Sequence, residues 1–358
     1  MAERSVAEPA GAERGGAEPP VKVGLHLTHQ RRPEQDPVVT LDEQLDLVRR
    51  ARDEGLDSVF AGQHHLAESF AHIQPLPWLA RLAAEAGEMT VGTGCHLLAV
   101  HHPVDTAEAY AGLDVVCRGR SVLAVGLGYR AEEYAAFGVP PGEKVRRFTE
   151  NLAIVDELWR GGTVTRDLPW VRLDEARLLQ RPVADPRPPI WITANADNAV
   201  RRAARLADAW MINPHATAAT VRRQLELFDA EREEHGRPPA TSRPLMREVF
   251  CADTREEALE RARPYLAGKY EVYADWGQDR VMPDQESFRM GFEALADDRF
   301  VIGTPDDCIK GLAVWLDLGV DHFILRTDWP GMPAEYAARS IELLAREVAP
   351  ALRCAPRT

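Results

Sequence analysis

The sequence predicts an α/β protein, a (β/α)8 TIM barrel with a helical insertion between its seventh and eighth strands. Eight short aliphatic segments, near residues 21, 57, 90, 121, 189, 209, 245 and 321, alternate with segments of helical periodicity. These segments are apolar throughout, as in parallel strands that are covered on both faces. The same alternation leaves an open doubly wound sheet as the alternative.

The first half of the chain supplies four of the expected strands. The pattern Thr40-Leu41-Asp42-Glu43 is that of a capping box, which predicts a helix that begins there and ends at Gly55. The strands are expected at 21–27, 56–61, 89–98 and 121–125, and the further helices at 75–86, 104–116 and 146–159. The αβ joint at 53–60, with Gly55 and Asp57, resembles the joint at 317–324, which predicts the same local structure at both ends of the barrel.

The second half begins after residues 160–187, where Gly161-Gly162 and several prolines predict a surface excursion. Strands are then expected at 189–193, 209–212, 245–252 and 321–326, and helices at 198–206, 218–235 and 333–348. Residues 254–300 are polar, helical and contain several aromatics, which predicts an inserted element over one end of the barrel. Residues 1–20 are expected to be a disordered tail, which leaves 21–353 as a single domain.

Composition narrows the range of partners. The net charge is -13 and the arginines are interleaved with acids, so nucleic acid and anionic membranes are not expected partners. No segment approaches the roughly 18 apolar residues of a membrane helix. The five cysteines are widely spaced and lack CxxC spacing, which favours reduced thiols in a cytoplasmic protein over disulfides or a zinc site.

His64-His65 is the first candidate for chemistry, because the pair follows the second predicted strand. Catalytic groups of α/β barrels lie at the carboxyl ends of the strands, and histidine titrates near neutral pH. A structural role, with one ring capping the loop and the other packing, is the alternative. Adjacent side chains on an extended segment point in opposite directions, so only one of the two is expected to face a cavity.

Two further strand ends indicate a cofactor. Gly126-Leu127-Gly128-Tyr129-Arg130-Ala131 matches a dinucleotide fingerprint literally, but the helix after it is too short for a crossover. The glycines favour close approach of a flat ring or phosphate over a plain tight turn. Residues 193–198 open a helix whose free N–H groups suit an anion. Ordinary capping by Asn195 or Asp197 is the alternative, and an acid there disfavours phosphate unless it points away.

Several histidines raise the alternative of a metal-dependent hydrolase. They follow or flank the first and third strands: His26, His29, His96, His101 and His102. His26 and His29 are three residues apart, which does not place two ligands on one face of a strand. Asp328 is the one acidic residue near the last strand end that could be a third ligand. No metal site is therefore predicted.

Residues 57–66, DSVFAGQHHL, resemble the Glu-His-His segment of bacterial luciferase and its relatives. The likeness continues in consistent order and covers about residues 21–350, with matching segments at 91–94, 102–108, 113–138, 147–159, 188–192, 203–210 and 302–321. The chain is therefore similar to the luciferase-like monooxygenases, from which it departs at Gln63, where luciferase has Glu. The resemblance implies a (β/α)8 barrel that forms a homodimer.

The resemblance also implies a flavin-dependent monooxygenase. Reduced FMN, supplied by a separate flavin reductase that binds transiently, would react with O2 to give a flavin C4a-peroxide that oxidises a small carbonyl or natural-product substrate. The alternatives are hydride transfer by a deazaflavin coenzyme without O2 chemistry, and a flavin-binding protein without catalysis.

The resemblance assigns roles to particular residues. His64 is the expected catalytic acid/base, and the cofactor-binding residues are expected to be His65, Thr93, Gly94, Gly126, Gly128, Tyr129, Arg130, Ala194, Asn195 and Ala196. Arg130 stands in for an arginine that contacts the flavin phosphate in luciferase. The aromatics within 254–300 make this element a candidate lid, although they also suit packing against the barrel rim.

Overall fold

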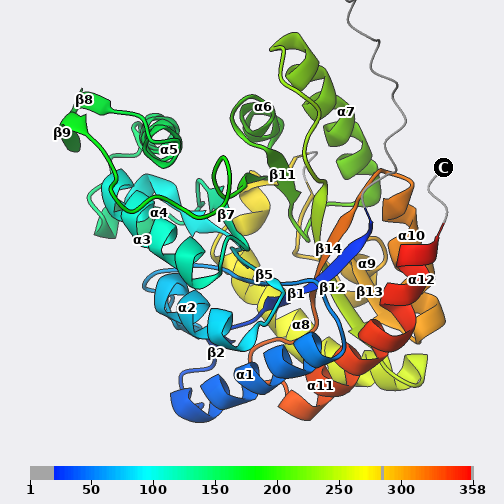
Figure 1. Ribbon diagram of the computed structural model, residues 1–358. Coiled ribbons are helices and arrows are strands. Elements are labelled where there is room, and N and C mark those ends of the chain that lie inside the picture. The colour runs from blue at the N-terminus through cyan, green and yellow to red at the C-terminus, as the bar shows by residue number, and fades with distance from the viewer. Residues whose placement is uncertain (1–19, 284–285, 356–358) are drawn as a thin grey trace, which may run out of the picture.

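The computed structural model describes residues 20–283 and 286–355 and contains a closed parallel barrel (Figure 1). Its eight strands are β1 (Lys22–Leu27), β3 (Ser58–Ala61), β5 (Thr90–Thr93), β7 (Ser121–Gly126), β10 (Ile190–Ala194), β11 (Ala209–Ile212), β12 (Pro244–Cys251) and β14 (His322–Arg326). β1 pairs with β3 and β14, and β7 pairs with β10, which closes the ring. The predicted barrel is confirmed and the open sheet is excluded. Apart from Pro20, the predicted tail lies outside the described residues.

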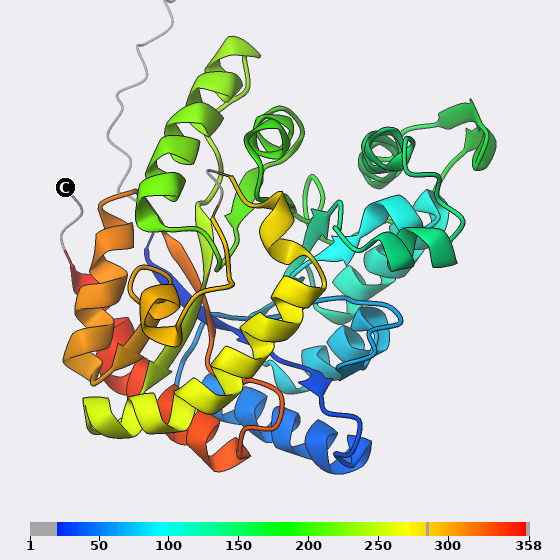
Figure 2. The same cartoon turned by 180° about the vertical axis from the view of Figure 1, so that it is seen from behind.

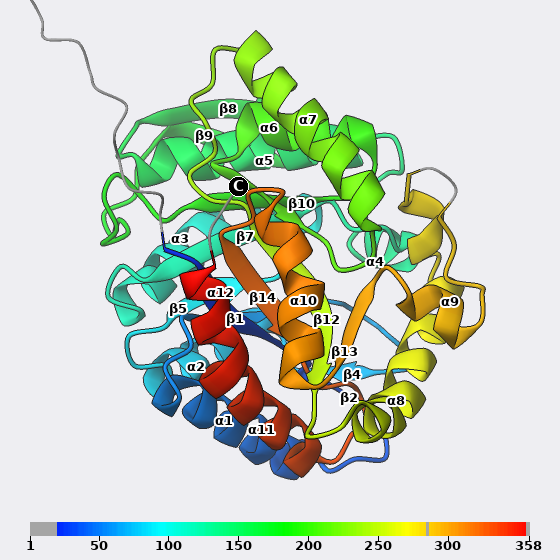
Figure 3. The same ribbon diagram turned by 90° about the vertical axis from the view of Figure 1, so that its right-hand side faces the viewer.

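Helices surround the strands and bury their apolar faces against them (Figure 3). They are α1 (Pro37–Asp53), α2 (Pro75–Glu85), α3 (Pro103–Val116), α5 (Lys144–Trp159), α6 (Asp197–Leu206), α7 (Ala218–Glu234), α10 (Pro305–Leu316), α11 (Ala334–Leu343) and α12 (Ala349–Cys354), with a π-helical turn at Leu344–Val348. Short elements lie at the strand ends: β2 (Gln30–Arg31), β4 (Ala71–His72), β6 (His96–Leu97), a 3-10 turn at Leu98–Val100 and α4 (Ala131–Ala136). In the described part of the chain, no helix is long and apolar enough to cross a membrane.

The predicted start of the first helix is wrong. α1 begins at Pro37, and the side chain of Asp36 accepts hydrogen bonds from the N–H groups of Val38 and Val39. Thr40 lies inside the helix, and its hydroxyl donates to the carbonyl of Asp36. An Asp followed by Pro at the first helical position is a stronger start than the downstream Thr, because Pro has a preset φ and no N–H to satisfy.

The two similar αβ joints have the same structure, as predicted. Gly55 and Gly319 end their helices with φ of 78° and 79°, a conformation that favours glycine. Asp57 accepts a hydrogen bond from the N–H of Val23 at 2.7 Å, and Asp321 accepts one from the N–H of Arg243 at 2.8 Å. Each aspartate thus fixes the start of a neighbouring strand.

The barrel interior below its mouth is filled by side chains. The rings of Phe60 and Trp191 stack with centroids 5.5 Å apart, and the ring of His322 lies 2.7 Å from the hydroxyl of Ser58. The inner cluster contains Phe60, Val122, Ala124, Trp191, Ala209, Met211, Met246 and Ile324. A ligand can therefore enter only at the end that these side chains leave open.

Two segments depart from the strand–helix alternation. Residues 160–187 contain an antiparallel hairpin, β8 (Val164–Leu168) and β9 (Val171–Ala176), which stands beside α5 away from the barrel (Figure 1). Between β12 and β14 lie α8 (Arg255–Asp275), a 3-10 turn at Gln278–Val281 and α9 (Phe292–Ala296), as the predicted insertion requires. The strand β13 (Phe300–Gly303), which was not predicted, then pairs with β12. Figure 2 shows α8 crossing one face of the barrel.

Candidate active site

A cavity of about 340 Å³ opens where the carboxyl ends of the barrel strands meet their loops. This volume is in the range of small-molecule sites. The first three barrel strands, β1, β3 and β5, with their loops contribute His26, Leu27, Thr28, His29, Gln30, Gly62, Gln63, His64, His72, Gly94, Cys95 and Leu97. The later barrel elements contribute Leu127, Gly128, Tyr129, Ile192, Thr193, Ala194, Asn195, Ala196, Asn213, Pro214, His215, Met246 and Arg326. Helices contribute Lys144, Phe148, Asn198, Ala199, Arg202, Tyr273, Gln278 and Val281.

Most of the site residues predicted from the sequence line this cavity. Those that line the cavity are His64, Gly94, Gly128, Tyr129, Ala194, Asn195 and Ala196. Those that do not line it are His65, Thr93, Gly126 and Arg130. The two histidines of the pair thus face in different directions.

His64 has a carboxylate partner. Its Nδ1 donates to Oε1 of Glu133 on α4 at 3.3 Å, and the backbone N–H of His65 donates to the same oxygen at 2.8 Å. Burial by itself disfavours the charged Glu133, but its bonds to His64 and His65 and the nearby Arg130 outweigh this cost and lower its pKa. The contact leaves Nε2 of His64 to exchange a proton with a ligand.

Glu133 places a negative charge beside the histidine pair, and the adjacent Gln63 is neutral. Gln63 is buried and has a bracing role, because its amide oxygen accepts from the N–H of Leu97 at 2.8 Å and its Nε2 lies 3.1 Å from Nε2 of His101. Sequence reasoning did not place Glu133 at the site. It is 69 residues from His64, and only the fold brings the two together.

Two of the predicted residues that do not line the cavity, Arg130 and His65, stabilise a loop beside it. Arg130 donates to the carbonyls of His65 and Leu66 at 2.7 and 3.3 Å, and its guanidinium lies 4.7 Å from the ring centroid of Trp276 at the end of α8. The ring of His65 packs 4.7 Å from that of Phe137. These contacts hold the loop after β3 in place, and neither side chain lines the cavity.

Gly126 and Thr93 are occupied by packing within the barrel. A Cβ on Gly126 would lie 2.6 Å from the hydroxyl of Thr193 and closer still to the sulfur of Cys95, so side chains of this chain fill the space at this glycine. The hydroxyl of Thr93 donates to the carbonyl of Ala124 at 2.6 Å and accepts from its N–H at 2.7 Å. Gly128, with φ of 78°, makes the turn that places Tyr129 in the cavity wall.

The start of α6 forms one end of the cavity. The side chain of Asp197 accepts hydrogen bonds from Arg223 at 2.7 Å and from Gln224 at 2.9 Å. These bonds lower the pKa of Asp197, and the bond from Arg223 has the largest effect. No side chain of the described residues caps the helix at Ala196. Lys144 and Arg202 add positive charge to the same cavity, and Nε of Arg202 is buried without a partner among the described residues. A helix N-terminus with two cations beside it suits an anion.

The opposite wall is rich in imidazole. A short antiparallel ladder pairs Gln30 with His72 and joins the loops after β1 and β3. The ring centroid of His72 consequently lies 5.6 Å from that of His29 and 5.5 Å from that of His64. Burial lowers the pKa of His29 to about 4 and that of His72 to about 2, so both rings are neutral at neutral pH.

A buried ion cluster ties α8 to the cavity floor. Nζ of Lys269 on α8 lies 2.5 Å from Oε1 of Glu248 in β12, and both side chains are fully buried. Arg326 at the end of β14 donates to the same oxygen at 3.2 Å and lines the cavity. Burial opposes the charge on Glu248, but the charges of Lys269 and Arg326 keep its pKa below the ordinary value.

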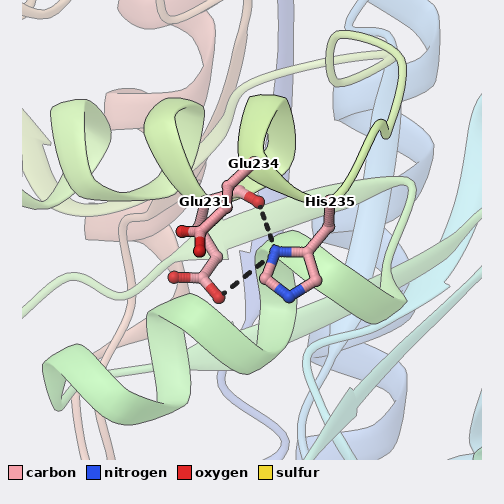
Figure 4. A group of neighbouring side chains, drawn as sticks. All are labelled: Glu231, Glu234 and His235. Carbon is pink, nitrogen blue, oxygen red and sulfur yellow. Dashed lines mark hydrogen bonds and ion pairs between the residues drawn. The ribbon is translucent and has the colours of Figure 1, made fainter.

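The histidines that raised the metal alternative do not gather as a ligand set in the described part of the chain. There, the one group of His and carboxylate side chains close enough to share an ion is Glu231, Glu234 and His235 on and after α7 (Figure 4). Arg201 and Arg205 each bind Glu231 at 2.7 Å, so this carboxylate is already neutralised. None of the three residues lines the cavity.

Comparison with known proteins yields one family. The family model described as luciferase-like monooxygenase matches residues 21–322. An F420-dependent glucose-6-phosphate dehydrogenase from Nakamurella multipartita is 29% identical over 322 residues, which are 87% of this chain and 92% of that protein. The oxygenase component of the flavin-dependent trigonelline monooxygenase from Acinetobacter baylyi is 26% identical over 326 residues, with coverage of 87% and 89%.

A solved structure shares the fold. The oxygenating constituent of 3,6-diketocamphane monooxygenase from Pseudomonas putida, in complex with FMN, superimposes with a TM-score of 0.77. The match is 20% identical and covers 92% of this chain and 98% of that chain.

The buried imidazoles predict a loss of stability in acid. The unfolded chain protonates His29 near pH 6.5, whereas the folded chain keeps it neutral down to about pH 4. The unfolded state therefore binds more protons between these values, and the free energy of unfolding falls as the pH falls through this window. We expect His29→Phe to reduce this slope in urea denaturation at a series of pH values. An unchanged slope would contradict a neutral His29.

Proposed function

Because this chain belongs to the luciferase-like monooxygenase family, whose relatives are named for flavin or F420, we propose that it is a flavin-dependent monooxygenase. It would use reduced FMN and O2 to oxidise a small carbonyl or natural-product substrate. The observation that carries the proposal is one cavity lined both by the start of α6 with Arg202 and Lys144 and by His64, whose ring contacts Glu133. Reduced FMN, when bound, supplies the electrons that activate O2.

The flavin phosphate fits the start of α6. The N–H groups there point at the cavity end, Arg202 and Lys144 line it, and Asp197 is held by Arg223 away from an incoming anion. We therefore assign to Arg202 the contact with the flavin phosphate that the sequence analysis expected of Arg130. The guanidinium of Arg130 instead binds carbonyls of the loop after β3. An isoalloxazine attached to this phosphate would extend past Gly128 and Tyr129 toward His64.

The His64–Glu133 pair suits a general acid/base. Glu133 fixes Nδ1 of His64 as the protonated nitrogen and stabilises the positive charge that the ring gains on taking a second proton. The remaining nitrogen faces the cavity side of the ring. A carboxylate that orients a histidine in this way is a positioning residue and does not itself transfer the proton.

The inserted helix α8 suits a lid. Tyr273 lines the cavity and bonds Gln30 at 3.1 Å, and Trp276 stacks on Tyr273 with centroids 5.5 Å apart. These contacts join α8 to the loops after β1 and β3. A closed lid would exclude water while oxygen is transferred, which is the protein's main contribution to such chemistry.

The printed name of one relative supports a protein partner for this chain. The trigonelline enzyme is named as an oxygenase component, which supports a separate flavin reductase as the source of reduced FMN for this chain. The free cysteines Cys95, Cys117, Cys251, Cys308 and Cys354 fit the cytoplasm, where such a reductase would act. We also infer a homodimer, as the family resemblance implies.

Hydride transfer with a deazaflavin is the second candidate, because a relative 29% identical to this chain is named as F420-dependent. Anaerobic titration with reduced FMN and with reduced deazaflavin, followed by stopped-flow mixing with O2, separates the two. We expect reduced FMN to bind more tightly and to be reoxidised in two spectral phases, since the enclosed cavity shields the ring. Tight binding of the deazaflavin alone, with no O2-dependent phase, would contradict the monooxygenase.

The phosphate site can be tested without turnover. Arg202→Met and Lys144→Met are each expected to weaken FMN binding about ten- to a hundredfold, the size of one charge-assisted hydrogen bond. Riboflavin, which lacks the phosphate, should bind equally well to all forms. Flavin fluorescence quenching measures both affinities. Arg205→Met is the matched control, because Arg205 lies on the same helix but pairs with Glu231; equal losses for FMN and riboflavin would rule out this phosphate site.

The acid/base pair gives a separate prediction. His64→Ala is expected to lower turnover of a carbonyl substrate by about 10²–10⁴, with little change in FMN affinity. Glu133→Gln should cause a smaller loss and shift the pH profile of turnover, because the amide cannot stabilise a charged imidazole. Turnover is followed as product formed from a panel of ketones and aldehydes. A His64→Ala variant with normal rates would assign the ring to packing.

A further inference from the structure

The cavity wall has cations and no carboxylate. Besides histidines, the titratable charged side chains among the described residues that line it are Lys144, Arg202 and Arg326, and none is an aspartate or a glutamate. The chain as a whole has 56 acidic and 43 basic residues, so the balance in the cavity is the reverse of that in the sequence. A cleft lined by charges of one sign attracts ligands of the other sign. The cavity therefore favours negatively charged groups.

Two of these cations serve the cofactor in the proposed function. Lys144 and Arg202 line the cavity together with the start of α6, where the flavin phosphate is proposed to bind. Arg326 belongs to a different part of the wall, because it is the last residue of β14. The strands β11 and β12 lie between β14 and β10, the strand that leads into α6. The charge of Arg326 is thus left without a ligand.

Arg326 is largely buried but borders the cavity. It lines the cavity, and 10% of its side-chain surface is exposed. Its partners in the chain are Oε1 of Glu248 at 3.2 Å, Nδ1 of His26 at 3.3 Å and the hydroxyl of Tyr273. Burial, and after it the charge of Arg326, keeps the pKa of His26 well below its ordinary value, so this ring is neutral. Of the three partners, Glu248 alone carries a charge.

Glu248 does not offset all of the positive charge around it. The oxygen that accepts from Arg326 also lies 2.5 Å from Nζ of Lys269, and the second oxygen accepts from the indole of Trp329 at 2.7 Å. Two cations thus share one carboxylate. Burial, and after it the charge of Arg326, lowers the pKa of Lys269 to about 7. The two cations therefore repel each other more than Glu248 compensates.

The other carboxylate near the end of β14 is engaged elsewhere. Asp328 is buried and accepts hydrogen bonds from Nε2 of Gln44 at 2.8 Å and from the N–H of Thr28 at 3.2 Å. It does not line the cavity, and the described part of the chain shows no ion pair between it and Arg326. Its charge lowers the positive potential at Arg326 but does not occupy the guanidinium.

We propose that Arg326 binds a carboxylate of the substrate, so that the substrate class is a carbonyl compound that also carries a carboxylate. This inference rests on the proposed function, since it names the substrate class of the same cavity. A guanidinium presents its N–H groups in a fork that matches the two oxygens of a carboxylate. Tyr273 contacts Arg326, and its ring centroid lies 6.4 Å from that of His64. A carboxylate held at Arg326 thus leaves the rest of the substrate beside the proposed acid/base.

The test compares a carboxylate with a neutral ligand of the same shape. 4-Acetylbenzoate and 4-acetylbenzamide share a ring and a ketone and differ in the charge of the second group. Isothermal titration calorimetry on the full-length protein, with and without saturating oxidised FMN, measures both. We expect the benzoate to bind about ten- to a hundredfold more tightly, the size of one charge-assisted hydrogen bond. Equal affinities, or a preference that FMN abolishes, would overturn the proposal.

Variants assign the preference to Arg326. Arg326→Met removes the charge and leaves Glu248 paired with Lys269, so the preference should fall to about threefold or less. The same loss is expected of Arg326→Gln, which keeps a hydrogen-bond donor for Glu248 and takes the place of the methionine variant if that one does not fold. A preference that survives undiminished in either variant would contradict the assignment.

Two further variants separate charge from structure. Arg326→Lys keeps the charge without the fork and should retain part of the preference. Arg299→Met is the matched control and should retain all of it. Arg299 is also buried and pairs with a carboxylate, Glu286 at 2.8 Å, but does not line the cavity. Equal losses in Arg299→Met and Arg326→Met would reduce the effect to general damage and overturn the proposal.

The outcome is separable from that of the proposed function, because no step of this experiment requires reduced flavin or O2. Arg202→Met should leave the preference for the benzoate unchanged, since that side chain serves the phosphate. A preference that depends on Arg326 supports the substrate site even if reoxidation of reduced FMN shows a single phase. Absence of the preference overturns the substrate site even if that reoxidation shows two phases.

Discussion

Closure of the barrel between β7 and β10 is the constraint on which the site depends. Parallel pairing of Ile190 with Leu123 and of Ile192 with Val125 joins the two halves of the chain. It brings the loop after β7, which carries Tyr129 and Glu133, beside the start of α6. An open sheet would leave these strand ends at opposite edges, and the anion site would have no histidine near it.

A second constraint is the buried charge of Glu248. Removing a carboxylate from water is costly unless cations replace its hydration. Here Lys269 comes from the inserted helix α8 and Arg326 from the last strand, so the insertion is tied to the barrel floor by electrostatics as well as by packing. The indole of Trp329 donates to the second carboxylate oxygen at 2.7 Å. The position of α8 therefore depends on the buried charge of Glu248 at the cavity floor.

The histidine pair has a carboxylate partner that is not its neighbour in the sequence. Gln63 braces the loop through Leu97 and His101, and the carboxylate comes from Glu133 on a different loop. Electrostatic support depends on the distance between a carboxylate and a ring, not on their separation along the chain. The local motif at residues 63–65 therefore does not show the carboxylate that His64 contacts.

The sequence by itself predicted the eight strands and the place of the insertion, and its family resemblance selected the barrel over an open sheet and His64 over His65. Periodicity, glycine at helix ends and aspartate before strands are local signals, and local physics fixes them. The tertiary structure alone decided that Glu133 partners His64, that Arg202 and not Arg130 lines the cavity, and that His29 and His72 lie on one wall. These relations join residues far apart in sequence, so only the packing of the closed barrel sets their distances.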